Sequence, residues 1–309
     1  MIRAAIAIGS NSTRMLTADK AGETLIPLLR GREETRLFMG LDDSGRIRPE
    51  RLEETARAVA RLALQARQAG AQSISLFATS ATRDAQNGQA LADRIRALCG
   101  LSMRVISGEE EARLAFLAVS QGQRRLVMDV GGGSTEWTVG ENNQVEWQTS
   151  MQLGSSRLLK MGAIQSLSDA ERMLDTVRGI IAPAAQRLRA CAPAPKMIGL
   201  GGACTTSAAM TMGHEAHGES VEGKTILLQT ARDQLRLLAS IPLEERMRVP
   251  GLPPARAVHM PHGLCILIAA MEASGFSQLT VSGKTNLDGY LMTLQEEDIT
   301  KEEPPCPRN

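Results

Sequence analysis

The stretch RRLVMDVGGGSTEW, residues 124–137, carries the pattern that decides the fold. An apolar run up to Val130 predicts a buried strand, the glycines at 131–133 predict a tight turn, and the chain then returns as a second strand. Glycine permits close approach of the backbone to a ligand, and successive N–H groups in such a turn form a concave surface for an anion. The stretch therefore predicts a strand–turn–strand unit with an anion-binding turn. The alternative is a glycine-rich turn that only closes a hairpin.

The same pattern occurs at the N-terminus. A shift of 122 positions places IGSNST, residues 8–13, over VGGGST, residues 130–135, so that glycine falls on glycine and Ser-Thr on Ser-Thr. A weaker third copy is Gly-Gly-Ala at 201–203, after Leu200. Two matched turns in one chain favour phosphate binding over simple hairpin closure. The repeat predicts two similar domains whose turns face one cleft.

Composition excludes several classes of protein. The 309 residues suit about two domains, and the 43% hydrophobic content suits a globular core. A net charge of +1 and 2% aromatic residues argue against binding to nucleic acid polymers or anionic membranes. The five cysteines show no CxxC spacing, which disfavours zinc and disulfides and fits a cytoplasmic location. The apolar stretch at 4–8 is too short for a signal peptide, and no run is long enough to span a membrane.

Hydrophobic periodicity predicts alternating strands and helices of an α/β protein. The expected helices are 49–69, 90–98, 107–119, 169–191, 205–212, 228–240 and 262–274. The expected strands are 2–8, 15–18, 24–29, 73–79, 102–106, 124–130, 196–200 and 278–281.

Asp129 is the first candidate for chemistry. It ends an apolar strand directly before the glycine turn, where a carboxylate could hold Mg²⁺ against bound phosphates. The alternative is an aspartate that only hydrogen-bonds its own turn. The equivalent position in the first repeat is Ala7, so one expected metal carboxylate is missing.

Acids and arginines near the turns are further candidates. Glu109-Glu110-Glu111 opens a helix, where acids complement the helix dipole, but one carboxylate could also activate a water molecule. Spacing alone does not select Glu111 from its neighbours. Arg83, after a strand, and Arg14, after the first turn, could each donate two hydrogen bonds to phosphate or simply lie at the surface.

Two stretches that resemble a phosphate-binding P-loop are rejected, and the histidine pairs are not assigned to a metal site. GESVEGKT, residues 218–225, matches the P-loop pattern, but no apolar strand precedes it and Glu219 and Glu222 would repel phosphate. SGKT at 282–285 lacks the upstream glycine. The histidine pairs His214/His217 and His259/His262 have no evident third ligand, so we interpret them as structural.

Six stretches together resemble the exopolyphosphatase/guanosine pentaphosphate phosphatase (Ppx/GppA) family, in the actin-like superfamily. They are residues 8–12, 77–88 (FATSATRDAQNG), 105–119 (VISGEEEARLAFLAV), 126–137 (LVMDVGGGSTEW), 153–158 (LGSSRL) and 199–210 (GLGGACTTSAAM). The resemblance implies an α/β fold with two ribonuclease-H-like domains around an interdomain cleft. The implied domains are 1–120 with 285–299, and 121–284, followed by a disordered tail at 300–309.

The resemblance also implies roles for individual residues. Glu111 would activate the nucleophilic water, and Asp129 would carry Mg²⁺. The phosphate-binding residues would be Gly9, Ser10, Asn11, Ser12, Gly131, Gly132, Gly133, Ser134 and Thr135, with Arg83, Arg14 and Arg157. The implied substrate is inorganic polyphosphate or a guanosine polyphosphate such as pppGpp, and a homodimer is left open.

Three departures from the family pattern limit these expectations. Ala7 replaces an acid, residues 256–263 lack the acid usual after Arg-Ala, and the chain stops where longer members continue into an HD-type domain. The short form predicts a preference for short phosphate chains. Ala7 also leaves open a phosphate-chain sensor with weak catalysis, and the fold leaves open an ATP-using kinase or ATPase with an adenosine pocket near 201–203.

Overall fold

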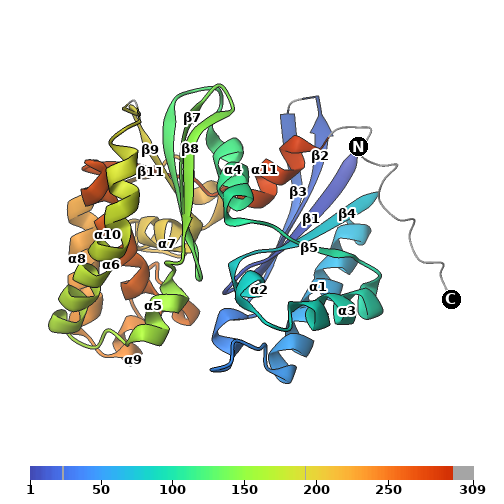
Figure 1. Ribbon diagram of the computed structural model, residues 1–309, viewed down its shortest axis with the longest axis horizontal. Helices are drawn as coiled ribbons and strands as arrows, with labels where there is room; N and C mark the ends of the chain where they lie inside the picture. Colours follow the sequence, from blue (N-terminus) through green and yellow to red (C-terminus); the bar gives the residue numbers. More distant parts are fainter. Residues whose placement is uncertain (23, 192, 295–309) are drawn as a thin grey trace. The chain divides into compact units, whose positions relative to one another are not determined.

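Two α/β units make up the chain in the computed structural model, which describes residues 1–22, 24–191 and 193–294 (Figure 1). Unit 1 comprises Met1–Leu114 and the segment that begins at Asn286; unit 2 comprises Ala115–Thr285. The first boundary lies inside helix α4 (Gly108–Val119), not after residue 120 as predicted. The reason is that Leu114 packs in a cluster of unit 1, whereas Ala115 and Phe116 pack in a cluster of unit 2. The predicted tail, 300–309, lies outside the described residues.

The sheet of unit 1 has the strand order β3-β2-β1-β4-β5. Its strands are β1 (Ile2–Ile8), β2 (Thr13–Ala21), β3 (Thr24–Glu33), β4 (Ser73–Ala78) and β5 (Met103–Val105). The first three form an antiparallel meander, whereas β4 runs parallel to β1, and β5 parallel to β4. Residues of β1 point alternately into two apolar clusters, so both faces of this strand are buried.

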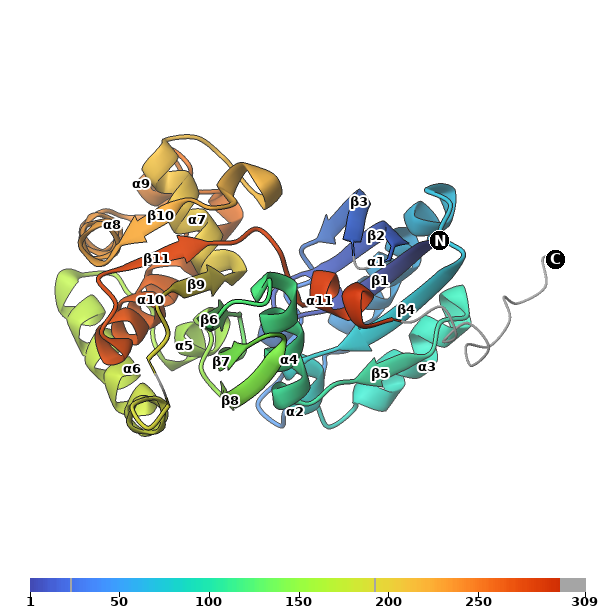
Figure 2. The ribbon, with the colours of Figure 1, turned by 90° about the horizontal axis from the view of Figure 1, so that it is seen from above.

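Helices cover both faces of the unit 1 sheet (Figure 2). One face packs on α1 (Pro49–Gln68) and α3 (Gly88–Cys99), and the other on α11 (Asn286–Thr293) and the first half of α4. The guanidinium of Arg30 on β3 donates two hydrogen bonds to the buried carboxylate of Asp288 on α11, at 2.6 and 3.2 Å. The segment 285–299 is expected to belong to the first domain; its described part forms α11 from Asn286, and 295–299 lie outside the described residues.

The sheet of unit 2 has the strand order β8-β7-β6-β9-β11-β10. Its first five strands correspond in order to β3-β2-β1-β4-β5 of unit 1, and β10 is an additional edge strand. Its strands are β6 (Arg125–Val130), β7 (Thr135–Glu141), β8 (Gln144–Met151), β9 (Met197–Leu200), β10 (Thr225–Leu227) and β11 (Gln278–Val281). Strands β6, β7 and β8 form the antiparallel meander, and β9 and β11 run parallel to β6. The predicted internal repeat is therefore confirmed at the level of topology.

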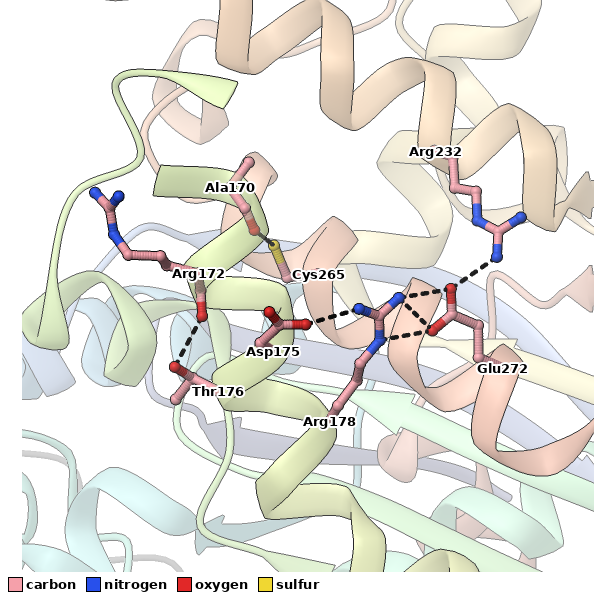
Figure 3. A network of polar contacts seen from close by, with 8 residues as sticks. All are labelled: Ala170, Arg172, Asp175, Thr176, Arg178, Arg232, Cys265 and Glu272. Carbon is pink, nitrogen blue, oxygen red and sulfur yellow. Dashed lines mark hydrogen bonds and ion pairs between the residues drawn. The ribbon is translucent and has the colours of Figure 1, made fainter. Parts of the chain in front are cut away.

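Helices α6 (Leu167–Leu188), α8 (Leu228–Ser240) and α10 (Met260–Ser274) pack together in unit 2. Figure 3 shows the ion pairs that join them: Arg178 on α6 and Arg232 on α8 both bond to Glu272 on α10, at 2.8–3.1 Å. Helix α5 (Ser155–Met161) packs on α10, and α7 (Gly201–Met212) follows β9. The prediction that this helix begins at Thr205 is wrong, because the Gly201-Gly202 pair forms its first turn.

The rejected P-loop match at 218–225 does not form a phosphate loop. Gly218–Val221 is a single 3₁₀ turn (η2), and Glu222 accepts hydrogen bonds from the Ser282 hydroxyl and the Gly283 N–H, each at 2.8 Å. The segment leads into strand β10 (Thr225–Leu227) and not into a helix, so it lacks the loop–helix geometry of a P-loop. Short elements complete the fold: η1 (Phe38–Gly40), α2 (Ser80–Asp84), α9 (Leu243–Arg246) and η3 (Pro254–Arg256).

Within residues 1–22, 24–191 and 193–294, no helix is both long and apolar enough to cross a membrane. Four cysteines, Cys99, Cys191, Cys204 and Cys265, are free thiols. The fifth, Cys306, lies outside the described residues.

The depressed pKa of the Glu53 carboxyl group leads to a prediction of how the stability of unit 1 depends on pH. Glu53 on α1 accepts hydrogen bonds from Arg94 on α3 and from Arg57, at 2.6–2.7 Å, and these arginines lower the pKa of Glu53 from 4.5 to about 2. A depressed carboxyl pKa stabilises the fold above pH 4.5, and this contribution is lost as the pH falls toward 2. We expect Glu53→Gln to lower the free energy of unfolding at pH 7 and to flatten its fall between pH 4.5 and 2. Urea unfolding measures this, with Glu50→Gln, an exposed acid of the same helix, as the control.

Candidate active site

Backbone N–H groups of the protein hold the carbonyl groups of the first glycine turn, Gly9–Ser12. The N–H of Gly9 donates to the carbonyl of Ser12 at 3.1 Å, and the carbonyls of Ser10 and Asn11 accept the N–H groups of Phe38 and Arg36 at 2.9 Å. The N–H groups of Ser10, Asn11 and Ser12 have no hydrogen-bond partner among the described residues. The turn therefore directs its acceptors into the protein and leaves three donors for an anion.

The second turn, Gly131–Ser134, has the same geometry. The N–H of Gly131 donates to the carbonyl of Ser134 at 3.0 Å. The carbonyls of Gly131 and Gly132 accept the N–H groups of 155–157, the start of α5, at 2.8–3.1 Å. Within the described part of the chain, the N–H groups of Gly132, Gly133 and Ser134 again have no partner.

Side chains reinforce the likeness between the two turns. The hydroxyl of Thr13 lies 3.1 Å from that of Thr35, and the hydroxyl of the equivalent Thr135 donates to the carbonyl of Leu153 at 2.6 Å. A Cβ atom added to Gly9 would lie 3.0 Å from the carbonyl oxygen of Ser12, and one added to Gly131 would lie 2.9 Å from that of Ser134. Both positions therefore require glycine for the same steric reason.

Glu111 is the buried member of the acid run on α4. It is 8% exposed, whereas Glu109 is exposed and Glu110 forms an ion pair with Arg104 at 2.6 Å. The Nη1 atom of Arg83 donates to Glu111 at 3.0 Å and to the carbonyl of Ile106 at 2.9 Å. The structure thus distinguishes Glu111 from its neighbours, which sequence spacing could not do.

Unit 1 also contains a group of buried polar atoms without hydrogen-bond partners. They are Asn11 Oδ1, Ser80 Oγ, Thr82 Oγ1 and Arg83 Nη2. Three of these residues belong to α2, whose preceding Thr79 donates its N–H to Ile8 at 3.1 Å, beside the first turn. Buried polar groups are normally paired, so unpaired ones in one region point to a ligand. Sequence reasoning missed Ser80 and Thr82 because a five-residue helix has no readable periodicity.

Asp129 lies at the end of β6, in register with Glu136 on β7. Opposite residues of an antiparallel pair share one face of the sheet, which places both carboxylates on the same side. Glu136 is 2% exposed and accepts the hydroxyl of Ser150 at 2.7 Å. The Oδ1 atom of Asp129 lies 2.6 Å from where a Cβ of Gly201 would be, so Gly201 leaves it room. Sequence reasoning missed Glu136 because its register with Asp129 becomes visible only when the strands pair.

The donor set around Asp129 bears on the expected Mg²⁺. Among the described residues, no cluster of three or more His, Cys, Asp or Glu side chains could hold a metal ion. Mg²⁺ commonly takes one or two carboxylates and completes its octahedron with water and substrate phosphates. Asp129, with Glu136 beside it, fits such a sparse site.

The same register in unit 1 carries different chemistry. Ala7 pairs with Arg14 where Asp129 pairs with Glu136, so unit 1 has an alanine and a cation in place of two carboxylates. Ala7 is 5% exposed and packs in the apolar cluster that includes Leu287. The Nε atom of Arg14 donates to the hydroxyl of Ser12 at 3.3 Å. The first turn is therefore suited to an anion and not to a cation.

Arg157 supports the second turn directly. Its Nε donates to the carbonyl of Gly133 at 2.8 Å, and its Nη2 donates to the side chain of Gln152. The carbonyls of all three glycines, 131–133, are thus held by 155–157. A phosphate contact of Arg157 stays a prediction, but its bracing contact with the turn is visible in the structure.

The close contact between the second turn and α5 yields a test. A Cβ atom on Gly154 would lie 2.3 Å from the carbonyl of Gly132, whereas one on Gly162, at the other end of α5, would meet nothing within 4 Å. We expect Gly154→Ala to displace the turn, to destabilise the fold by about 1–3 kcal/mol and to weaken tripolyphosphate binding. Calorimetric titration measures the binding. Gly162→Ala is the matched control, and equal binding by both variants would contradict the assignment.

Comparisons with known proteins bear on the fold and the family of the chain. Residues 16–296 match the model of the Ppx/GppA phosphatase family. The structure of the PPX-GPPA enzyme of Aquifex aeolicus is similar, with 26% identity, a TM-score of 0.80 and coverage of 95% of this chain and 99% of that one. An exopolyphosphatase of Cytophaga hutchinsonii, 23% identical, shares the fold with a TM-score of 0.86, over 95% of this chain and 97% of its own. A match over most of the sequence, two units of one topology and two equivalent glycine turns lead to one conclusion: the chain belongs to the Ppx/GppA phosphatase family.

Proposed function

We propose that the protein hydrolyses the terminal phosphoanhydride bond of a linear phosphate chain, either short inorganic polyphosphate or a guanosine polyphosphate such as pppGpp. The observation that carries the proposal is the ion pair between the half-buried Arg83 and the buried Glu111, in which one guanidinium nitrogen holds the carboxylate and the other is buried without a partner. A base fixed next to an unused cationic donor is what hydrolysis of a phosphate requires. The family supports a phosphatase, and solved relatives that are described as exopolyphosphatases support the substrate class.

Binding follows from the donors that the fold leaves unused. The three N–H groups of the first turn and the Nη2 atom of Arg83 supply hydrogen bonds to phosphate oxygens from unit 1. The three N–H groups of the second turn do the same from unit 2. A linear chain offers several phosphate groups, each with oxygen atoms that donors of this kind can bind.

Glu111 acts as the general base. Its Oε2 atom is fixed by Arg83 at 3.0 Å, so the carboxylate has a defined orientation toward a water molecule. The carboxylate takes a proton from the water while the water oxygen bonds to the terminal phosphorus. The bond from that phosphorus to the bridging oxygen breaks, and the shortened chain leaves with the electron pair. The proton passes on from Glu111 to a phosphate oxygen or to solvent.

Asp129, with Glu136 on the adjacent strand, would hold Mg²⁺. When bound, Mg²⁺ supplies positive charge that offsets the charge of the phosphate oxygens. Ala7 lies in an apolar cluster and carries no carboxylate. Asp129 and Glu136 are therefore the pair that we propose for the metal.

The role of Glu111 predicts a specific loss. Glu111→Gln keeps the size and the hydrogen bond from Arg83 but removes the base, so we expect phosphate release to fall by about 10²–10⁴-fold with tripolyphosphate binding retained. The assay measures phosphate release with Mg²⁺ from tripolyphosphate, long polyphosphate and pppGpp. Glu110→Gln on the same helix is the matched control. Full activity of the Glu111 variant would exclude this mechanism, and a rate that rises with chain length into the hundreds would exclude the short-chain preference.

A second candidate, a phosphate-chain sensor with weak catalysis, is motivated by Ala7. We expect Ala7→Asp to leave phosphate release unchanged or lower. The new carboxylate would enter an apolar cluster opposite Arg14 and cost about 1–3 kcal/mol of stability. Thermal unfolding and phosphate release of the variant measure both effects. A large gain in release would instead mean that the natural chain is a weakened enzyme and would favour the sensor.

A further inference from the structure

Helix α5 connects the second glycine turn to two buried side chains. At its start, the N–H groups of 155–157 hold the carbonyls of Gly131 and Gly132. Just beyond its end, the carbonyl of Gly162 accepts from Nε2 of His262 at 2.8 Å, and the carbonyl of Ile164 accepts from Arg246 at 2.9 Å. His262 is 1% exposed and Arg246 5%. The segment that follows α5 is thus fixed from two directions by side chains inside unit 2.

His262 makes its contact as a neutral ring. Burial lowers the pKa of His262 and outweighs the carbonyls of Gly162 and Val258, which raise it. The charge of Arg246 lowers the pKa further, so the ring is neutral at neutral pH. The Nε2 contact with Gly162, at 2.8 Å, is shorter than the Nδ1 contact with the carbonyl of Val258, at 3.3 Å. The N–H therefore belongs on Nε2, where it donates to the end of α5.

The residue after His262 shows how closely α10 approaches the site. A Cβ atom on Gly263 would lie 2.9 Å from the Cβ of Ala203 and 3.9 Å from that of Ser155. Ala203 lies in the first turn of α7, two residues after Gly201, and Ser155 begins α5. The first turn of α10 therefore lies against the starts of both helices that border the glycine turn and Asp129.

We propose that His262 is a positioning residue for the second phosphate-binding turn. Its hydrogen bond to Gly162 fixes α5, and α5 in turn fixes the carbonyls of Gly131 and Gly132 so that the N–H groups of the turn stay directed toward phosphate. His262 itself contacts no substrate. The functional part of this inference rests on the proposed phosphate binding, whereas the mechanical part does not.

The mechanical part is tested in the ligand-free protein by amide hydrogen exchange at 155–157. Loss of one ordinary hydrogen bond corresponds to about a tenfold change in an equilibrium, so we expect about tenfold faster exchange in His262→Leu. His262→Gln carries an amide N–H in place of Nε2–H and restores protection. Ile268→Val is the control, because Ile268 lies on the same helix but lines a pocket with Leu174 and Leu235 of α6 and α8. If His262→Leu does not fold, His262→Asn, whose amide is too short to reach Gly162, replaces it.

The functional part is tested with tripolyphosphate. We expect the dissociation constant to rise about tenfold in the leucine or asparagine variant and to return in the glutamine variant. Exchange at 155–157 that matches the Ile268→Val control would overturn the positioning role, as would unchanged affinity in a variant with faster exchange. If the unmodified protein fails to bind tripolyphosphate, the proposed function fails, and the exchange measurement still decides whether His262 holds α5.

Discussion

The site depends on one constraint: the carbonyl groups of each glycine turn must be held by the protein so that the N–H groups of the turn stay free for an anion. Segment 36–38 does this for the first turn and segment 155–157 for the second. In each case the supporting segment follows the third strand of the meander, so the topology brings it behind the turn. A glycine turn without such support would satisfy its own donors and acceptors or collapse onto its neighbours. The fold therefore sets the direction of these N–H donors through backbone geometry before any charged side chain contributes.

The two units share this backbone but differ in the residues on it. At the paired positions before and after the turn, unit 1 has Ala7 and Arg14, and unit 2 has Asp129 and Glu136. The first pair places a positive charge beside the first turn, and the second is the carboxylate pair that we propose for a cation. In our proposal, both units would therefore bind phosphate, with side chains of opposite charge at these positions. Ala7 is consistent with this division, because its surroundings are apolar and its strand partner is already a cation.

The sequence was sufficient for the parts of the structure that depend on local pattern. The repeat at 8–13 and 130–135, most helices and most strands follow from periodicity and glycine position. Other features depend on contacts between distant segments and could not be predicted. The start of α7 at Gly201 reflects the pairing of β9 with β6, and the division within α4 reflects which cluster each half joins. The selection of Glu111 required burial, since all three acids fit the first turn of a helix equally well.

The same distinction explains why the supporting residues were harder to predict than the turns. His262 and Arg157 looked like a structural histidine and an arginine for phosphate, and the structure shows both joined to backbone carbonyls of unit 2. A backbone carbonyl has no identity in the sequence, so a side chain that binds one leaves no pattern of paired residue types. Charged groups that face substrate can be inferred from their chemistry. Groups that hold the backbone behind the substrate can be inferred only from coordinates, although the orientation of the same N–H donors depends on them.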